Sequence, residues 1–253
     1  MACPSLLPTG VAGIHRYAQV VEGVKAVERR LGRAPRAQHE TDALAHERTV
    51  AAGQAVLAFG RVTAPESVLF ATQHEFAAVA HTLQIDIGEA IRLANRHPRV
   101  DILNPGIGVG GHCIPIDPWF IKEVDPTNSR LIFTARMIND EIPTKIAAHI
   151  RAAVRGIENP QIIAIGAAYK PDTADTRESP SVEIVRLLRA YGCRVTHFDP
   201  LVDGMEFPTT MEAACKDADC LALLVQHKIV MEEFTAKRTE IENVMKTPQI
   251  LQY

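Results

Sequence analysis

A cysteine that could serve as a nucleophile stands at the end of a glycine-rich stretch. Cys113 follows His112 directly, and the carboxylate of Asp117 comes four residues later. A thiol that lies among backbone N–H groups ionises more easily, and its thiolate attacks a carbonyl carbon. A nearby carboxylate can then position the water that releases the product. The alternative is a tight turn whose cysteine is merely buried, and the spacing alone leaves both interpretations open.

Glycines give the backbone before this cysteine unusual freedom, because glycine accepts positive φ and lets a ligand approach closely. They occupy four of six positions: Gly106, Gly108, Gly110 and Gly111. Three of them fit G-x-G-x-x-G, the dinucleotide-binding fingerprint, which requires a helix directly behind it. Pro115 and Pro118 predict that no helix begins here. We therefore expect a proline-bracketed loop that presents Cys113, and no dinucleotide site.

Further motifs lie on both sides of residues 104–116, which we call the cysteine loop. They are Asn95-Arg-His-Pro-Arg-Val100, Asp117-Pro-Trp-Phe120, Ser129-Arg-Leu-Ile132 before Asn139-Asp140, Gly166-Ala-Ala-Tyr-Lys-Pro-Asp-Thr-Ala-Asp-Thr-Arg-Glu-Ser-Pro180 and Leu223-Leu-Val-Gln-His227. In order and spacing, over roughly residues 70–250, they resemble the UDP-glucose/GDP-mannose dehydrogenase family. The flanks look most like those of members that act on UDP-N-acetyl-D-mannosamine.

The resemblance implies a reaction and its residues. In the family, NAD accepts two hydrides in turn from C6 of a UDP-sugar, which converts an alcohol into a carboxylate. Cys113 matches the nucleophile that forms the thiohemiacetal and the thioester, and Asp117 matches the acid that positions water. The substrate-binding positions implied by the resemblance are His97, Arg99, Gly110, Tyr169 and Lys170, and the cofactor-binding position is Arg177.

Residues 157–253 alternate between strand and helix patterns. Strands are expected at 162–169, 194–198 and 220–225, and helices at 180–191 and 210–218. This alternation predicts a parallel sheet that is covered on both faces, with a ligand crevice at the carboxyl ends of the strands. Polar residues that follow the strands at this edge are Lys170, Asp172, Asp175, Arg177, Glu178, Asp199 and His227.

Two interpretations of this edge remain open. Lysine and arginine can bind a diphosphate, and Ser179 before Pro180 marks a helix start whose free N–H groups favour an anion. Alternatively, Asp175 and Glu178 form a structural salt-bridge network around Arg177.

The preceding part, residues 64–156, has helical spacing. Two packed helices are expected over 64–95, ending at His97-Pro98-Arg99, and a long helix over 129–156 that is interrupted near Pro143 and completes a helical core. These helices should expose an apolar face, and the resemblance implies that two subunits pair through it as a homodimer. Asn139-Asp140 could be a dimer contact or an exposed pair.

Residues 1–63 do not fit the resemblance. They suggest helices at 17–31 and 46–59 but contain no strand–glycine turn–helix unit, whereas family members begin with an NAD-binding Rossmann domain. The family's oxyanion-stabilising lysine and asparagine fall at Phe59 and Thr63. We therefore expect a truncated or inactive form. Alternatives are a non-catalytic UDP-sugar-binding dimerisation module, or an α/β module whose cysteine loop is structural.

Composition narrows the class of protein further. A net charge of −3 over 253 residues gives no reason to expect nucleic acid or a membrane as partner, and no apolar run approaches the ~20 residues of a membrane span. The odd, scattered cysteines fit a reducing cytoplasm and predict no metal site: Cys3, Cys113, Cys193, Cys215 and Cys220. The expected fold is α/β: an atypical segment 1–63, a central helical domain 64–156 and a Rossmann-like UDP-binding domain 157–253, without the NAD-binding Rossmann domain.

Overall fold

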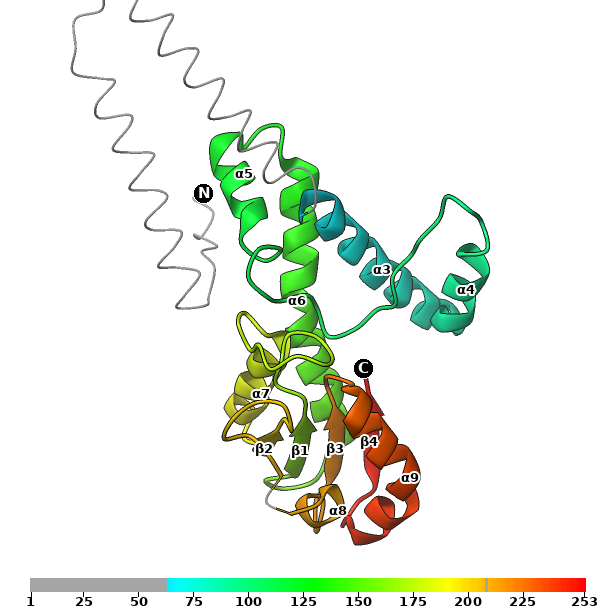
Figure 1. The fold of residues 1–253 in the computed structure, drawn as a ribbon, viewed down its shortest axis with the longest axis vertical. Helices are drawn as coiled ribbons and strands as arrows, with labels where there is room; N and C mark the ends of the chain where they lie inside the picture. The colour runs from blue at the N-terminus through cyan, green and yellow to red at the C-terminus, as the bar shows by residue number, and fades with distance from the viewer. Residues whose placement is uncertain (1–62, 208) are drawn as a thin grey trace, which may run out of the picture.

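The computed structural model describes residues 63–207 and 209–253. Helices make up the first part of this chain, and a sheet covered by helices makes up the second (Figure 1). The predictions of helices at 17–31 and 46–59, and the position of Phe59, lie outside the described residues. No helix among the described residues is long and apolar enough to cross a membrane.

The helical part contains α3 (Thr63–Leu83), α4 (Ile87–Ala94), α5 (Asp117–Val124) and α6 (Arg130–Ala153). The two helices predicted over 64–95 are therefore confirmed. Asp86 caps α4, because its side chain accepts a hydrogen bond from the Glu89 N–H at 3.2 Å. Helix α4 ends at Ala94 with Asn95 as its C-cap, slightly before the predicted end at His97-Pro98-Arg99, which lie in the turn that follows.

Two expectations about proline were wrong. Helix α6 runs through Pro143 without interruption. Proline lacks the N–H that would bond the carbonyl of Asn139, and Pro143 is buried where α6 packs, so we infer that tertiary packing offsets the lost bond. Helix α5 does begin at Asp117, with Pro118 in its first turn, where the N–H needs no partner. The dinucleotide fingerprint still fails, because no strand precedes these glycines among the described residues.

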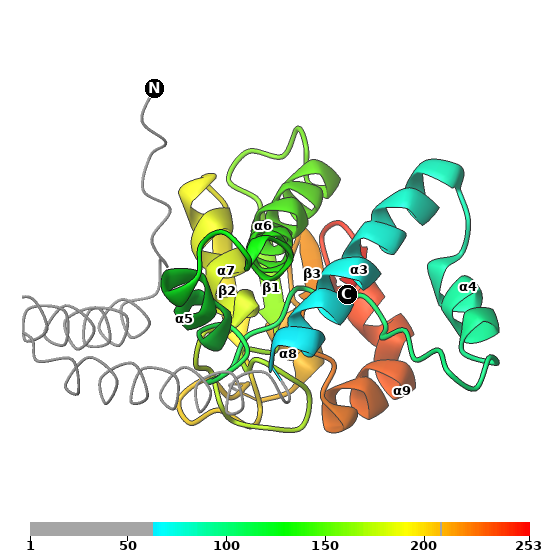
Figure 2. The same cartoon turned by 90° about the horizontal axis from the view of Figure 1, so that it is seen from above.

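The second part is a four-stranded parallel sheet in the order β2-β1-β3-β4, with strands β1 (Gln161–Ile165), β2 (Arg194–Phe198), β3 (Cys220–Leu223) and β4 (Gln249–Gln252). Helices α7 (Pro180–Ala190), α8 (Met211–Ala214) and α9 (Lys228–Val244) connect the strands. One hydrophobic core lies between the sheet and helices α6 and α7, and another lies against α8 and α9. The predicted parallel sheet with both faces covered is thus confirmed (Figure 2).

Several elements are shorter than predicted. Helix α8 covers Met211–Ala214 where a helix was expected over 210–218, since Asp217 adopts a left-handed conformation with φ +59° that cannot continue a helix, and β3 ends at Leu223 where a strand was expected over 220–225. Strand β1 ends at Ile165 and not at Tyr169, because Gly166 turns the chain with φ +93° so close to Val225 that a Cβ would lie 2.4 Å from its side chain. Helix α6 completes the helical core only with its first half. Its second half, including Ala147 and Ile150, belongs to the core of the sheet. The division into domains at residue 156 stays a prediction.

Candidate functional site

The cysteine loop lies directly against the loop that joins β1 to α7, residues 166–179, which we call the β1–α7 loop. The Gly111 N–H donates a 3.0 Å hydrogen bond to the carbonyl of Arg177. A Cβ on Gly110 would stand 2.1 Å from the carbonyl oxygen of Glu178, and a Cβ on Gly111 would stand 3.0 Å from the ring of Tyr169. These glycines therefore allow two backbones to touch, and Gly110 contributes through its missing side chain.

Asn139 fixes the other side of the cysteine loop. Its amide accepts a hydrogen bond from the Val109 N–H at 2.8 Å and donates one to the Val109 carbonyl at 3.2 Å. The side chain of Asn139 is buried, so the pair is not exposed as a whole, whereas Asp140 is exposed and its role as a dimer contact stays a prediction. Asp140 pairs with the buried Arg136 one turn earlier. The Asn139 side chain of α6 thus pairs with both the N–H and the carbonyl of Val109 in the cysteine loop.

Cys113 is exposed, so the interpretation of a merely buried cysteine was wrong. Its Sγ lies 3.3 Å from Nδ1 of His112, within hydrogen-bonding distance. Its carbonyl accepts hydrogen bonds from the N–H groups of Ile116 and Asp117 at 3.0 and 2.8 Å, where α5 begins. This turn places the thiol of Cys113 and the carboxylate of Asp117 on adjoining turns of the backbone. The imidazole of His112 is in position to exchange a proton with the thiol.

Arg177 is committed to Asp175 through its side chain. Its Nε donates to both carboxylate oxygens of Asp175 at 2.9 Å. These bonds lower the pKa of Asp175 to about 2, with a smaller contribution from His112. They also raise the pKa of Arg177, and electrostatic interactions with Tyr169 and Cys113 raise it further. The salt-bridge interpretation is confirmed for Asp175, whereas the structure shows no ion pair between Arg177 and Glu178.

Tyr169 and Lys170 lie on the same loop as this pair. The Tyr169 N–H donates to the carbonyl of Asp175 at 2.9 Å, which closes the base of the loop. Lys170 is exposed, and its ammonium stands 5.5 Å from the centre of the Tyr169 ring. The two predicted nucleotide-sugar positions are therefore adjacent, and Tyr169 touches the cysteine loop at Gly111.

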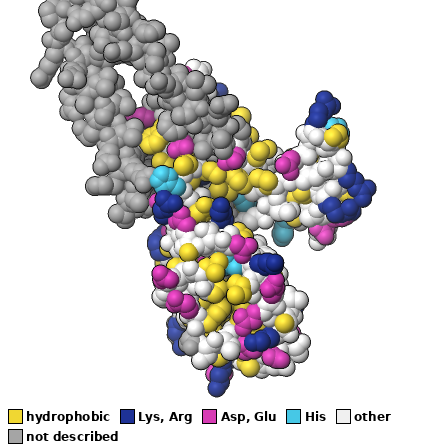
Figure 3. Space-filling view, in the orientation of Figure 1, with side chains coloured by type: hydrophobic (Ala, Val, Ile, Leu, Met, Phe, Trp, Pro, Cys, Tyr) yellow, Lys and Arg dark blue, Asp and Glu magenta, His cyan; other side chains and the backbone are white. Residues whose placement is uncertain are grey.

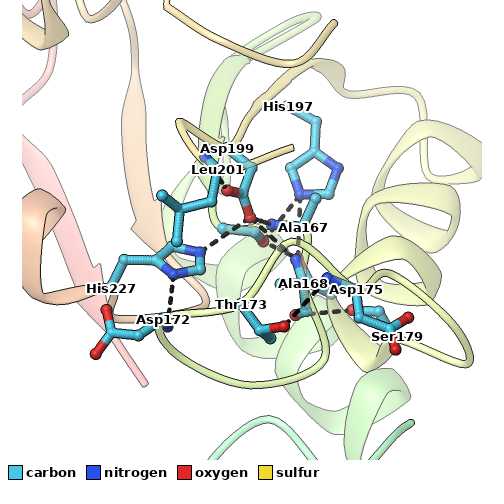
Figure 4. A network of polar contacts seen from close by, with 12 residues as sticks. Ala167, Ala168, Asp172, Thr173, Asp175, Ser179, His197, Asp199, Leu201 and His227 are labelled. Carbon is cyan, nitrogen blue, oxygen red and sulfur yellow. Dashed lines mark hydrogen bonds and ion pairs between the residues drawn. The ribbon is translucent and has the colours of Figure 1, made fainter. Parts of the chain in front are cut away.

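A buried polar network lies behind this loop (Figure 4). One oxygen of Asp199 accepts hydrogen bonds from the N–H groups of Ala167 and Ala168 at 2.6 and 3.0 Å and lies 3.0 Å from Nε2 of His227. The other accepts from the N–H of Leu201 at 2.9 Å. Burial alone would raise the pKa of Asp199, but these bonds outweigh it and lower the pKa to about 2. The sequence placed Asp199 and His227 at this edge of the sheet but did not predict that they bond.

His97 and Arg99 lie away from this site. Both are exposed in the turn after α4, and the contact between them is local: the Arg99 N–H donates to His97 Nδ1 at 3.3 Å. Both views show α4 standing out at the far end of α3, to the side of the sheet (Figures 1 and 2). The structure does not bring these two predicted residues together with Cys113 of the same chain.

A pocket of about 300 Å³ opens on the far side of the cysteine loop, between α6 and the start of α7. Arg136 and Asp140 line it on one side, and Glu178 lines it on the other. Burial lowers the pKa of Arg136 and raises that of Asp140, and the ion pair between them opposes both shifts. The Nε atom of Arg136 is buried without a hydrogen-bond partner. Sequence reasoning missed this arginine, because nothing in its neighbourhood marks it as buried.

By fold and site, the chain is an α/β protein in which a loop with an exposed thiol lies against the loop that follows a strand of a parallel sheet. Models of the UDP-glucose/GDP-mannose dehydrogenase family match residues 65–141 as its central domain and residues 163–252 as its UDP binding domain. The chain belongs to the UDP-glucose/GDP-mannose dehydrogenase family.

Relatives within the family are similar over these same regions. The chain is 42% identical over 160 residues to a UDP-N-acetyl-D-mannosamine dehydrogenase of Methanococcus maripaludis, covering 62% of this chain and 37% of that protein. The UDP-D-ManNAc dehydrogenase structure from Pyrococcus horikoshii matches with a TM-score of 0.68 and 35% identity, covering 75% of this chain and 45% of that one. A UDP-N-acetyl-mannosamine dehydrogenase of Staphylococcus aureus matches with a TM-score of 0.65 and 33% identity, covering 74% and 44%. The chain thus spans about two fifths of the length of such curated relatives.

Family members use NAD, and Arg177 is the residue of this chain that was predicted to bind it. Arg177 presents an exposed guanidinium, but Asp175 already occupies its Nε. Between residues 63 and 253, where the structure describes them, no glycine-rich turn joins a strand directly to a helix, so the dinucleotide-binding fingerprint is not found there. Nor does the described part contain a group of three or more histidine, cysteine or acidic side chains that could hold a metal ion.

Proposed function

We propose that this chain carries the nucleotide-sugar side of a UDP-sugar 6-dehydrogenase site, with UDP-N-acetyl-D-mannosamine as the substrate. One observation carries the proposal. The loop with the exposed thiol is built against the loop with Tyr169, Lys170 and Arg177, through the Gly111 hydrogen bond and the contact that Gly110 permits. A ligand whose diphosphate binds the second loop would then have its sugar beside the first.

The residues of this site suit distinct tasks. Lys170 offers a mobile point charge to a diphosphate, and Tyr169 offers a flat ring beside it. Cys113 would form the bond to the carbon of a sugar aldehyde, and His112 would exchange the proton of the thiol. Asp117 would orient the water that hydrolyses the thioester. The similarity in sequence and structure to UDP-N-acetyl-D-mannosamine dehydrogenases supports the choice of sugar.

Oxidation by this chain alone is a separate question. The family's NAD-dependent reaction takes a C6 alcohol to a carboxylate, and it uses a lysine and an asparagine to stabilise the oxyanion. Phe59 and Thr63 stand at those positions and cannot supply an ammonium or an amide. We therefore expect the purified chain to bind the nucleotide sugar without reducing NAD. This expectation corresponds to the non-catalytic UDP-sugar-binding module, and Phe59 and Thr63 are the reason for preferring it.

Pairing of two chains is part of the proposal. Helix α3 buries small and polar side chains, among them Gln73 and His74, and exposes the large apolar side chains of Phe76, Val79 and Leu83. Apolar side chains are prominent on this helical part of the molecule (Figure 3). Such an exposed apolar face is typical of a protein interface. A second chain bound there would cover the apolar face, and the turn after α4 would then be free to reach the partner's site.

Calorimetry with UDP tests the proposed function. Losing one charge-assisted contact to a diphosphate costs on the order of 1.5–3 kcal/mol, so Lys170→Ala should weaken UDP binding about tenfold to a hundredfold. Lys216→Ala, which removes an exposed lysine between α8 and β3, should bind UDP like the wild type. NAD should bind more weakly than UDP. Equal affinities for the two variants, or no heat with the wild type, would contradict the proposal.

A further inference from the structure

The tip of the β1–α7 loop is attached to the start of α9 by two hydrogen bonds. The Asp172 N–H donates to Nδ1 of His227 at 2.9 Å, and the Asp172 carboxylate accepts from the Lys228 N–H at 2.9 Å. Asp172 adopts a left-handed conformation with φ +57°, which costs free energy in a residue other than glycine. The two bonds therefore hold the tip in a conformation that it would not favour by itself.

The first bond fixes the chemical state of His227. A backbone N–H can only donate, so Nδ1 of His227 must accept and carries no proton. The ring then carries its proton on Nε2, which lies 3.0 Å from a carboxylate oxygen of Asp199. His227 is fully buried. The neutral Nε2–H tautomer satisfies both ring nitrogens, and the other tautomer would satisfy neither.

Asp199 stabilises this tautomer, and its own position does not depend on the bond to His227. The carboxylate is fully buried and also accepts three backbone N–H groups, from Ala167, Ala168 and Leu201. Those bonds keep it ionised and fixed in place, as its lowered pKa also indicates. The order of contacts therefore runs from Asp199 through His227 to the Asp172 N–H, and from there to the loop tip.

Lys170 lies two residues before Asp172, at the exposed end of this arrangement. Within the part of the chain that the structure describes, its ammonium contacts the ring of its neighbour Tyr169 and forms no ion pair. Its direction is thus set by the backbone of the loop. That backbone is fixed at its base by the bond from Tyr169 to Asp175, and at its tip by His227.

We propose that His227 is a positioning residue for the nucleotide-sugar site: in its Nε2-protonated form, oriented by Asp199, it holds the Asp172 N–H and thereby directs Lys170 toward the diphosphate. This inference rests on the proposed function, since it concerns the same site. His227 does not touch the ligand. It acts on binding through the shape of the β1–α7 loop.

A matched pair of substitutions separates positioning from general stability. In His227→Asn, the side-chain oxygen stands where Nδ1 stood and can accept from the Asp172 N–H, whereas the bond to Asp199 is lost. In His227→Gln, the amide nitrogen reaches the place of Nε2 and keeps the bond to Asp199, whereas Nδ1 has no replacement. Both variants are neutral, and thermal unfolding shows whether each remains folded. We expect His227→Asn to bind UDP within about threefold of the wild type, and His227→Gln to bind about tenfold more weakly.

Hydrogen exchange at the Asp172 amide provides a reading without ligand. It should be slow in the wild type and in His227→Asn, and faster in His227→Gln. Equal UDP affinities and equal exchange in the two variants, with a wild type that binds UDP and depends on Lys170, would overturn the positioning role alone. Absence of UDP binding in the wild type would overturn the proposed function instead, and the role of His227 in that site with it.

Discussion

Removing the amide of Asn139 should loosen the cysteine loop. In Asn139→Ala, the Val109 N–H and carbonyl lose their partners at 2.8 and 3.2 Å. Each hydrogen bond contributes a net ~0.5–1.5 kcal/mol, and a half-buried group left unpaired adds a further penalty of about 1 kcal/mol or more. We therefore expect the free energy of unfolding to fall by about 2–4 kcal/mol.

Two assays read this change. Urea unfolding gives the loss of stability, and the rate of Cys113 alkylation reports on the loop, since the thiols of Cys193, Cys215 and Cys220 are buried. Cys3 lies outside the described residues and is removed as Cys3→Ser in every sample. Thr144→Ala changes an exposed residue on the same helix and should leave both readings within error. A loss below about 0.5 kcal/mol, with an unchanged alkylation rate, would refute the view that Asn139 holds the loop.

Further predictions concern other parts of the molecule. Burial lowers the pKa of His74 to about 4, below its ordinary value of 6.5, so between these two values the unfolded chain binds a proton that the folded chain does not. The free energy of unfolding should therefore fall by about 3 kcal/mol as the pH drops from 6.5 to 4. If the unfolding of His74→Gln depends on pH just as strongly in this window, His74 is not the cause. Gly110→Ala should destabilise the protein by more than 1 kcal/mol in urea unfolding, because its Cβ would meet the carbonyl of Glu178 at 2.1 Å. If the variant is as stable as the wild type, the cysteine loop and the β1–α7 loop can separate without cost. Phe76→Glu and Leu83→Glu should shift a dimer toward monomer in light scattering, whereas a wild type that is monomeric at micromolar concentration contradicts the pairing.

Periodicity and strand order predicted the elements that position the site. The alternation after residue 157 was sufficient to place Lys170, Asp199 and His227 at one edge of a parallel sheet, because the carboxyl ends of parallel strands share an edge. Helical spacing predicted α3 and α4 in the same way. It did not reveal α9, whose apolar residues are widely spaced among charged ones.

Contacts between distant residues could not be predicted in this way. The hydrogen bonds from Asn139 to Val109 join residues 30 apart in the chain, and the bond from His227 to the Asp172 N–H joins residues 55 apart. A propensity rule does not describe such pairs, because they depend on how α6 and the sheet pack. Pro143 was misjudged for the same reason, since its side chain is buried where α6 packs, and only the tertiary structure shows this.

Protection of the thiol by the nucleotide sugar tests the central claim most directly, namely that the cysteine loop and the β1–α7 loop form one site. The rate of Cys113 alkylation is measured in the Cys3→Ser protein with and without saturating UDP-N-acetyl-D-mannosamine, and again in Lys170→Ala. Bound substrate should slow alkylation severalfold, and the protection should require a higher concentration in Lys170→Ala. An alkylation rate that does not change, at a concentration where calorimetry shows the site to be full, would contradict the claim.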